Sequence, residues 1–311
     1  MNNFLEIREF SLRARREFSL RARSDGMCIN IPSFVLEAGK TTALIGKSGA
    51  GKSVFTCLLM GRPSFGVGGK CSLEKFSLFG QKFTSCMFTS RSKLNLAVGH
   101  VCHKGALMYM PQNFPLSRSS LTTVRSSFSM FLSALLRNGG CPKVDAAKSL
   151  MDELSARGLA TLADKPLSKL SGGERRRVEL ATRLAAVRKC KKPTILLLDE
   201  PTTGFDRKSA DDFMREVCGC VRDSELASNV SVIFATHDLS CLDGEDGERI
   251  ANNVAVICRE ESEIQLCFAG NPDELRKKLY LPDDFSYAKD GAKIYGGIEM
   301  LPMMKSSHRE R

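Results

Sequence analysis

The sequence predicts an α/β fold with a mostly parallel core sheet, and three short apolar runs support this prediction. The runs span Thr41–Ile45, Ile195–Leu198 and Val232–Thr236, and each is followed at once by a glycine or a polar residue. Strands buried on both faces of a parallel sheet have this near-continuous apolar character. Segments with helical periodicity lie between the runs, which favours the α/β class.

The first run leads into a glycine-rich loop and then into a helix. The loop consists of Gly46, Lys47, Ser48, Gly49, Ala50, Gly51, Lys52 and Ser53, and it fits G-x-x-x-x-G-K-[ST] at every fixed position. Glycine is needed because successive backbone N–H groups turn inward around phosphate oxygens, and the helix N-terminus adds its positive end. We expect Lys52 to reach the β- and γ-phosphates and Ser53 to bind Mg²⁺. The loop therefore predicts that the chain binds ATP with magnesium and hydrolyses it.

The second run ends in an acidic pair, Asp199 and Glu200, followed by Pro201. Ligands of open α/β sheets gather at the carboxyl ends of the strands, which is where this pair lies. We expect Asp199 to hold Mg²⁺ through water and Glu200 to accept a proton from the attacking water. Two solvated acids that merely end a strand are the alternative, but they would not explain the four large aliphatic residues before them.

A third motif reads Leu170, Ser171, Gly172, Gly173 and Glu174, and it opens a helix with Val178, Ala181, Leu184 and Ala185 on one face. Ser171 and Glu174 form a capping-box pattern. Two glycines in a first turn weaken a helix by about 1 kcal/mol each relative to alanine, so a purely structural cap explains them poorly. Backbone N–H groups directed at an anion explain them better.

These three motifs, in this order, resemble the nucleotide-binding subunit of ATP-binding-cassette (ABC) transporters, and the resemblance extends over nearly the whole chain. It implies a P-loop NTPase of ABC type with an N-terminal antiparallel β subdomain and an α-helical subdomain. In this family two subunits join head to tail, so Ser171 and Gly173 of one subunit, with Gly172 and Glu174, would contact the γ-phosphate held by Lys52 of the other. A closed two-fold assembly then has two identical shared sites.

The resemblance also implies roles for three further residues. Gln112, which follows Met108–Pro111, matches the glutamine that touches Mg²⁺ and water and reports the nucleotide state to a partner. Asp206 ends Thr202–Asp206, which matches the loop that crosses the dimer interface. His237 follows the strand Val232–Thr236 and matches the switch histidine that contacts the γ-phosphate.

We expect one ABC ATP-binding domain over residues 1–311, with a catalytic core from 1–112 and 170–279. Residues 113–169 would form the helical subdomain, because Val124, Phe128, Phe131, Leu132, Leu135 and Leu136 share a helical face and a second helix is predicted from about Val144 to Arg157. In the family this subdomain carries a groove for a helix of the membrane subunit. Further on we expect a hairpin of Val254–Cys258 and Ile264–Phe268, then a helix from Pro272 to about Leu279. The tail 280–311 has no clear period.

Composition narrows the class of protein. The 311 residues are 42% hydrophobic and 26% charged, which is ordinary for a globular chain. No apolar run approaches the roughly 20 residues of a membrane-spanning helix, and residues 1–10 do not read as a secretory signal, so we expect a cytosolic protein. The twelve cysteines are then expected to be reduced core residues. The spacing of His100, Cys102, His103 and Cys86 matches no standard zinc pattern.

The net charge of +11 is compatible with nucleic acid, an anionic membrane face or a phosphate-rich ligand, and it does not choose among them. Arginines concentrate in a direct repeat in which Glu9–Arg15 and Glu17–Arg23 both read EFSLRAR. Its alternating pattern favours a two-faced β segment, with Phe10 and Phe18 in the core, over an arm that binds nucleic acid. The chain departs from the family in two places: Ala14 or Ala22 occupies the position of the adenine-stacking aromatic, and the stretch 61–105 is long.

The leading hypothesis is the ATPase subunit of a transporter that works as a dimer, homomeric or heteromeric, with ATP and Mg²⁺. It would act through separate transmembrane permease subunits and lie peripherally on the cytoplasmic face of the membrane. The alternative is a soluble ABC-type ATPase acting on nucleic acid or ribosomes. The single cassette and the absence of sustained heptads count against that alternative, so we do not expect nucleic acid as a partner. A binding-only protein without catalysis would not need Lys52, Asp199, Glu200 and His237 together.

Overall fold

A computed structural model describes residues 3–13, 28–59, 70–72, 74–78, 81–82, 99–102, 105–112, 122–137, 146–190, 192–222, 229–244, 247–260 and 263–279. Several sequence predictions fall outside these residues. They concern Ala14, Ala22, Phe18, the second repeat copy Glu17–Arg23, Cys86, His103, most of the stretch 61–105, the glycines 139–140 and the tail 280–311.

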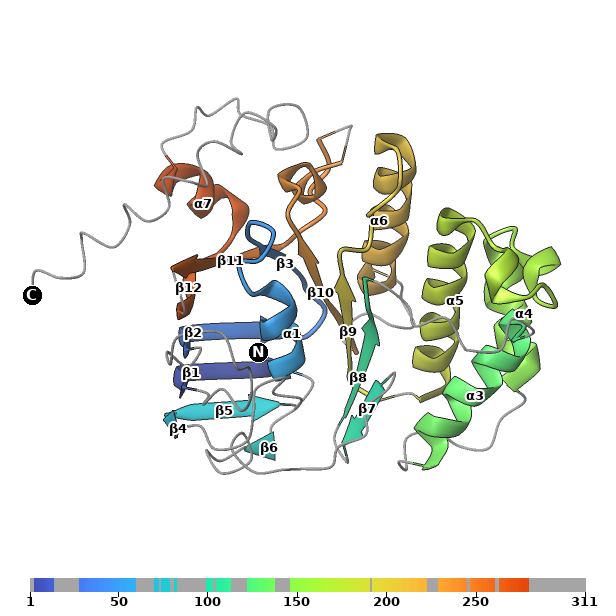
Figure 1. Ribbon diagram of the computed structural model, residues 1–311, viewed down its shortest axis with the longest axis horizontal. Helices are drawn as coiled ribbons and strands as arrows, with labels where there is room; N and C mark the ends of the chain where they lie inside the picture. Colours follow the sequence, from blue (N-terminus) through green and yellow to red (C-terminus); the bar gives the residue numbers. More distant parts are fainter. Residues whose placement is uncertain are drawn as a thin grey trace, which may run out of the picture.

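The described strands form one twelve-stranded sheet with the order β6-β5-β1-β2-β12-β11-β3-β10-β9-β8-β7, while β4 pairs with β1 (Figure 1). Their bounds are β1 Asn3–Arg13, β2 Cys28–Glu37, β3 Thr41–Ile45, β4 Lys70–Ser72, β5 Lys75–Leu78, β6 Gln81–Lys82, β7 Gly99–Cys102, β8 Gly105–Met110, β9 Thr194–Asp199, β10 Val230–Thr236, β11 Asn253–Glu260 and β12 Glu263–Gly270. The helices are α1 Lys52–Leu59, α3 Val124–Arg137, α4 Ala146–Ala156, α5 Gly172–Cys190, α6 Arg207–Arg222 and α7 Pro272–Lys278, with short 3₁₀ turns η1 Ala160–Leu162, η2 Leu167–Lys169 and η3 Leu239–Leu242.

The core of the sheet is parallel. Strands β11, β3, β10, β9 and β8 are parallel neighbours, whereas β1 pairs antiparallel with β2, β4 and β5 at the N-terminal side. The α/β class, the parallel core and the antiparallel N-terminal strands are therefore confirmed. The hairpin β11–β12 and the helix α7 also form where the sequence predicted them, and Asn271 and Glu274 cap α7 reciprocally.

Two hydrophobic cores cover the two faces of the sheet, which explains why the central strands show no alternation. Leu196 and Leu198 of β9 lie in one core with side chains of α5 and α6. Ile195 and Leu197 lie in the other with Phe55 of α1 and the strands β1 and β2. Because both faces are buried, every residue of β9 must be compatible with a core.

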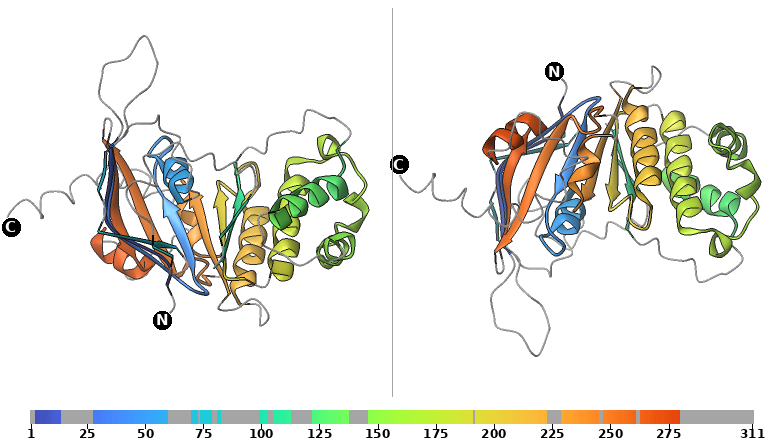
Figure 2. Two further views of the ribbon diagram at one scale, coloured as in Figure 1. Left: turned by 90° about the horizontal axis from the view of Figure 1, so that it is seen from below. Right: turned by 90° about the horizontal axis from the view of Figure 1, so that it is seen from above.

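Helices α3 and α4 stack outside α5, at the opposite end of the molecule from β1, β2 and β12 (Figure 2). Val124, Phe128 and Phe131 of α3 are buried, as their helical spacing predicted. The second predicted helix is α4, which begins at Ala146. Both helices that the sequence predicted in this region are therefore present.

Replacing Phe128 with Ala is expected to lower the free energy of unfolding by about 3–5 kcal/mol, because the ring is 1% exposed and its loss leaves a cavity. Denaturant unfolding of the full chain measures this change. Met130→Ala on the same helix is the control, since Met130 is 57% exposed and should alter stability by no more than about 0.5 kcal/mol. Equal effects of the two substitutions would contradict the packing of α3.

The first copy of the N-terminal repeat lies partly in β1, where Phe10 is fully buried, as predicted. Cys218, Cys220 and Cys241 are also buried, and burial raises the pKa of each thiol to about 12, so they act as small apolar core residues. Among the described helices, none is both long and apolar enough to cross a bilayer.

Candidate nucleotide-binding site

The predicted site residues meet because the strands that carry them are neighbours. Strands β3, β10, β9 and β8 run parallel, so the segments after their carboxyl ends lie at one edge of the sheet. The phosphate loop follows β3, His237 follows β10, Asp199 ends β9 with Glu200 directly after it, and Gln112 follows β8. The sequence prediction that these segments share one edge is therefore consistent with the observed strand order.

The phosphate loop depends on glycine at its bends. Gly49 and Gly51 have φ angles of 79° and 103°, which side chains disfavour. A Cβ at Gly46 would lie 2.5 Å from the Ile257 carbonyl oxygen, and one at Gly51 would lie 2.5 Å from Ile264 Cδ1. The hairpin β11–β12 thus packs tightly against the back of the loop, while Lys47, Ser48 and Gly49 remain exposed to a ligand.

Lys52 lies over the loop with its ammonium group held by backbone. Its Nζ donates to the Gly46 carbonyl at 2.7 Å and to the Lys47 carbonyl at 3.2 Å, and it lies 3.3 Å from Glu200 Oε1. The side chain is only 6% exposed. A buried cation in this position is suited to bind phosphate oxygens at the start of α1.

Asp199 is the centre of an oxygen-rich cluster. Ser53 Oγ donates to Asp199 Oδ2 at 2.9 Å and the Tyr109 hydroxyl donates to the same oxygen at 3.2 Å. Burial raises the pKa of Asp199, and the two hydrogen bonds oppose that shift. Asp199 Oδ1 is buried and has no hydrogen-bond partner within the described part of the chain. A carboxylate and a hydroxyl are ligands that Mg²⁺ prefers, so these residues fit the predicted metal.

Glu200 lies between Lys52 and His237. Its Oε2 is 2.8 Å from His237 Nδ1, and its backbone N–H donates to the Ala235 carbonyl at 2.9 Å. The φ of Glu200 is 46°, which is uncommon for a residue with a side chain and is found at functional sites. Glu200 is 8% exposed, whereas the His237 side chain is about half exposed. The Glu200 carboxylate is therefore buried beside Lys52, whereas the His237 imidazole remains accessible.

The motif Ser171–Glu174 forms the capping box that the sequence predicted at the start of α5. The Ser171 N–H donates to Glu174 Oε2 at 2.8 Å, and the Glu174 N–H donates to Ser171 Oγ at 3.2 Å. The bond from the Ser171 backbone lowers the pKa of Glu174. A Cβ at Gly172 would meet nothing within 4 Å, so the N-terminal face of α5 is open there. A Cβ at Gly173 would lie 3.0 Å from Phe205 Cε1.

Asp206 has a structural role that the family resemblance did not indicate. It caps α6, because its carboxylate accepts from the Ser209 N–H at 3.0 Å and the Ser209 hydroxyl at 2.7 Å. The bond from the Ser209 backbone lowers the pKa of Asp206. Gln112 is exposed, and its backbone carbonyl accepts a hydrogen bond from Arg176 Nη2.

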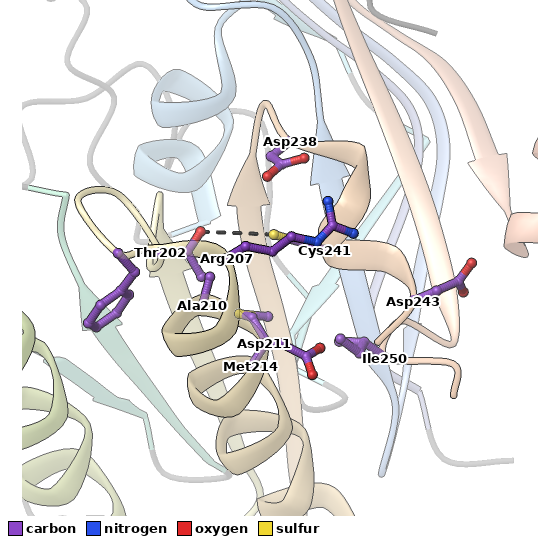
Figure 3. Close-up of a pocket in the computed structure, with 10 residues that line it drawn as sticks. Thr202, Arg207, Ala210, Asp211, Met214, Asp238, Cys241, Asp243 and Ile250 are labelled. Carbon is purple, nitrogen blue, oxygen red and sulfur yellow. Dashed lines mark hydrogen bonds between the residues drawn. The ribbon is translucent and has the colours of Figure 1, made fainter. Parts of the chain in front are cut away.

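A pocket of about 230 Å³ lies beside the loop after Glu200, between α6 and η3 (Figure 3). Thr202 Oγ1 and Cys241 Sγ are 3.9 Å apart across it. Two of its acids have ion-pair partners: Asp211 pairs with Arg215 at 2.8 Å and Asp243 with Arg249 at 3.1 Å. The pocket adds no residue to the phosphate-binding cluster.

Sequence reasoning missed three residues that support the site. Tyr109 contacts Asp199, and Arg176 and Arg183 of α5 hold the carbonyls at the end of β8. A signal for Arg183 exists, because it is the charged residue within the buried run from Ala181 to Val187.

The chain is similar in sequence to known proteins. A model of the family described as "ABC transporter" matches residues 29–203. The uncharacterized ABC transporter ATP-binding protein YbbA of Escherichia coli strain K12 is 31% identical over 207 residues, covering 66% of this chain and 78% of that protein. The nickel import ATP-binding protein NikO of Rhodobacter capsulatus is 29% identical over 232 residues, covering 74% of this chain and 79% of that protein.

The solved structure of cbiO1 from Clostridium perfringens, part of the ABC transporter complex cbiONQ, shares the fold. Its TM-score is 0.57 at 20% identity, and the alignment covers 97% of this chain and 100% of that chain. The family model covers more than half of the chain, and YbbA is 31% identical over 78% of its own length. The chain therefore belongs to the ABC transporter family and is an ATP-binding cassette with ATPase activity.

Proposed function

We propose that the chain is one of two cassettes that close head to tail around ATP and Mg²⁺ and drive transport through separate membrane subunits. The observation that carries the proposal is the cluster of Lys52, Glu200 and His237, joined by contacts of 3.3 Å and 2.8 Å at the end of the phosphate loop. An ammonium, a carboxylate and an imidazole in contact at this point suit a γ-phosphate and its attacking water.

In the proposed reaction each side chain has one task. Lys52 binds the β- and γ-phosphate oxygens, and Glu200 accepts the proton of the water that attacks the γ-phosphorus. His237 orients Glu200 through the 2.8 Å contact and reaches the γ-phosphate with its exposed edge. Ser53, Asp199 and Gln112 would hold Mg²⁺, which neutralises charge on the phosphates when bound.

The other half of each site would come from the partner cassette. At the start of α5, Gly172 is exposed with open space beside it and Gly173 is partly exposed, next to the capping box of Ser171 and Glu174. Such a helix N-terminus binds anions. We infer that it covers the γ-phosphate held by Lys52 of the second subunit, with the Asp206 loop beside it.

A complementation experiment tests the shared site. Lys52→Ala and Ser171→Arg chains should each be inactive alone, because each disables both sites of its own dimer. When the two are mixed, every mixed dimer keeps one site with an intact Lys52 and an intact Ser171. Half of the dimers are mixed on random pairing, so ATPase activity should return to about a quarter of wild type. The measurement is phosphate release.

The matched control is a mixture of Lys52→Ala with Lys52→Met chains, which cannot form an intact site in any pairing. If the first mixture were no more active than the control, the shared site would be refuted. That result would not bear on whether each chain binds ATP.

The proposed membrane partner has its own test. We propose residues 1–112 and 170–279 as the catalytic core and 113–169 as the helical subdomain that engages a permease on the cytoplasmic face. Mild detergent extraction of the tagged chain should recover integral membrane proteins. Salt-sensitive recovery of nucleic acid or ribosomes in their place would favour the alternative ATPase of that class.

A further inference from the structure

Tyr109 connects the metal-binding carboxylate to the helix that begins at the Ser171–Glu174 motif. On one side, its hydroxyl donates to Asp199 Oδ2 at 3.2 Å, the same oxygen that accepts from Ser53. On the other side, its backbone carbonyl accepts two bonds from Arg183 of α5, from Nε at 3.3 Å and Nη2 at 3.1 Å. The residue therefore contacts both elements at once.

Arg183 is held firmly enough to act as an anchor. It is 3% exposed, and its guanidinium lies 5.4 Å from the centre of the Phe131 ring of α3. Its Nη1 also donates to the Glu179 carbonyl at 3.1 Å. Burial lowers its pKa to about 10, so it stays charged at neutral pH. The N–H donors of a guanidinium lie in one plane in a fixed geometry. Arg183 therefore restrains the Tyr109 carbonyl more rigidly than an ammonium group would.

A second arginine of α5 continues the same contact along the chain. Arg176 Nη1 donates to the Pro111 carbonyl at 2.7 Å, and Nη2 donates to the Gln112 carbonyl. Arg176 and Arg183 of α5 thus hold the backbone carbonyl groups of residues 109, 111 and 112, which lie at the end of β8 and directly after it.

The chemical consequence lies at Asp199. Its two oxygens differ: Oδ2 accepts from Ser53 and Tyr109, whereas Oδ1 is buried without a partner in the described residues. A second donor on Oδ2 opposes rotation of the carboxylate and leaves Oδ1 as the oxygen that is free to bind a cation. If Ser53 bound a metal ion instead of donating to Asp199, the Tyr109 hydroxyl would be the remaining donor to Oδ2.

We propose that Tyr109 is a positioning residue for the metal-binding carboxylate Asp199, and that Arg183 sets its position from the helix that begins at the Ser171–Glu174 motif. This inference rests on the proposed role of Asp199 in binding Mg²⁺. In this proposal α5 is linked through Arg183 and Tyr109 to the metal site of its own subunit. This link is separate from the proposed contact of α5 with the γ-phosphate held by the partner subunit.

Tyr109→Phe tests the hydroxyl without removing the ring. In a non-hydrolysing Glu200→Gln background, ATP affinity in excess EDTA should be unchanged, while Mn²⁺ affinity of the ATP complex, measured by electron paramagnetic resonance, should fall about three- to tenfold. We expect the fall in Mn²⁺ affinity to be about threefold, because 3.2 Å is long for a hydroxyl-to-carboxylate bond. Unchanged Mn²⁺ affinity would overturn the proposal.

Arg183→Met tests the anchor, and Arg188→Met is its matched control. Arg188 lies on the same helix but pairs with Glu153 of α4 at 2.6 Å. Arg183→Met should weaken Mn²⁺ binding and be non-additive with Tyr109→Phe, whereas Arg188→Met should leave it unchanged. Additive effects, or equal effects of the two methionine variants, would overturn the anchor. Loss of ATP binding by the wild-type chain would instead refute the proposed function.

Discussion

Replacing Glu200 with Gln is expected to reduce ATP turnover by about a hundredfold to ten-thousandfold, because a general base contributes this much to catalysis. The amide keeps the size of the carboxylate, so Lys52 and the phosphate loop should still bind ATP. A cassette that binds ATP without cleaving it should then accumulate in the closed dimer. Phosphate release measures the first effect, and sedimentation with and without ATP measures the second.

Glu153→Gln is the matched control, because Glu153 is also a buried carboxylate with cationic partners, Arg157 and Arg188, but lies in α4. It should lower stability and leave the turnover of the folded protein unchanged. Wild-type turnover of Glu200→Gln would refute the role of Glu200 as base. Normal dimerisation without ATP in that variant would refute the link between ATP and closure.

The sequence predicted the parts of the fold and site whose signals are local. The phosphate loop needs glycine at fixed positions, and the strand before Asp199 needs continuous apolar residues because it is buried on both faces. Both requirements leave a pattern along the chain. The capping box of Ser171 and Glu174 is local in the same way and was confirmed by its two hydrogen bonds.

The contacts that the sequence did not reveal join residues far apart in the chain. Tyr109 and Asp199 are 90 positions apart, and Tyr109 and Arg183 are 74 apart. A tyrosine near the end of a strand has no local pattern that identifies its hydrogen-bond partner. The positive φ of Glu200 also leaves no pattern in the sequence, because it follows from the turn after β9 and from the hydrogen bond between its N–H and the Ala235 carbonyl.

Replacing Gly51 with Ala is expected to weaken ATP binding by about tenfold to a hundredfold, since the substitution combines two costs. The φ of 103° is strained for any residue with a side chain, and the new Cβ would lie 2.5 Å from Ile264 Cδ1. Strain of this kind costs about 1–3 kcal/mol, and about 1.4 kcal/mol corresponds to tenfold in affinity. The loop must then move away from β12, which would displace the N–H groups proposed to bind phosphate. Isothermal titration with ATP measures the loss.

Two further variants separate strain from steric conflict. Gly158→Ala introduces a side chain at a φ of 66° with nothing within 4 Å, so it should cost stability without changing ATP affinity. Adding Ile264→Ala to Gly51→Ala makes room for the new methyl group but leaves the strained φ. Affinity should therefore recover only in part. Full recovery would show that φ at Gly51 is not constrained, and wild-type affinity of Gly51→Ala alone would show that the hairpin β11–β12 does not shape the phosphate loop.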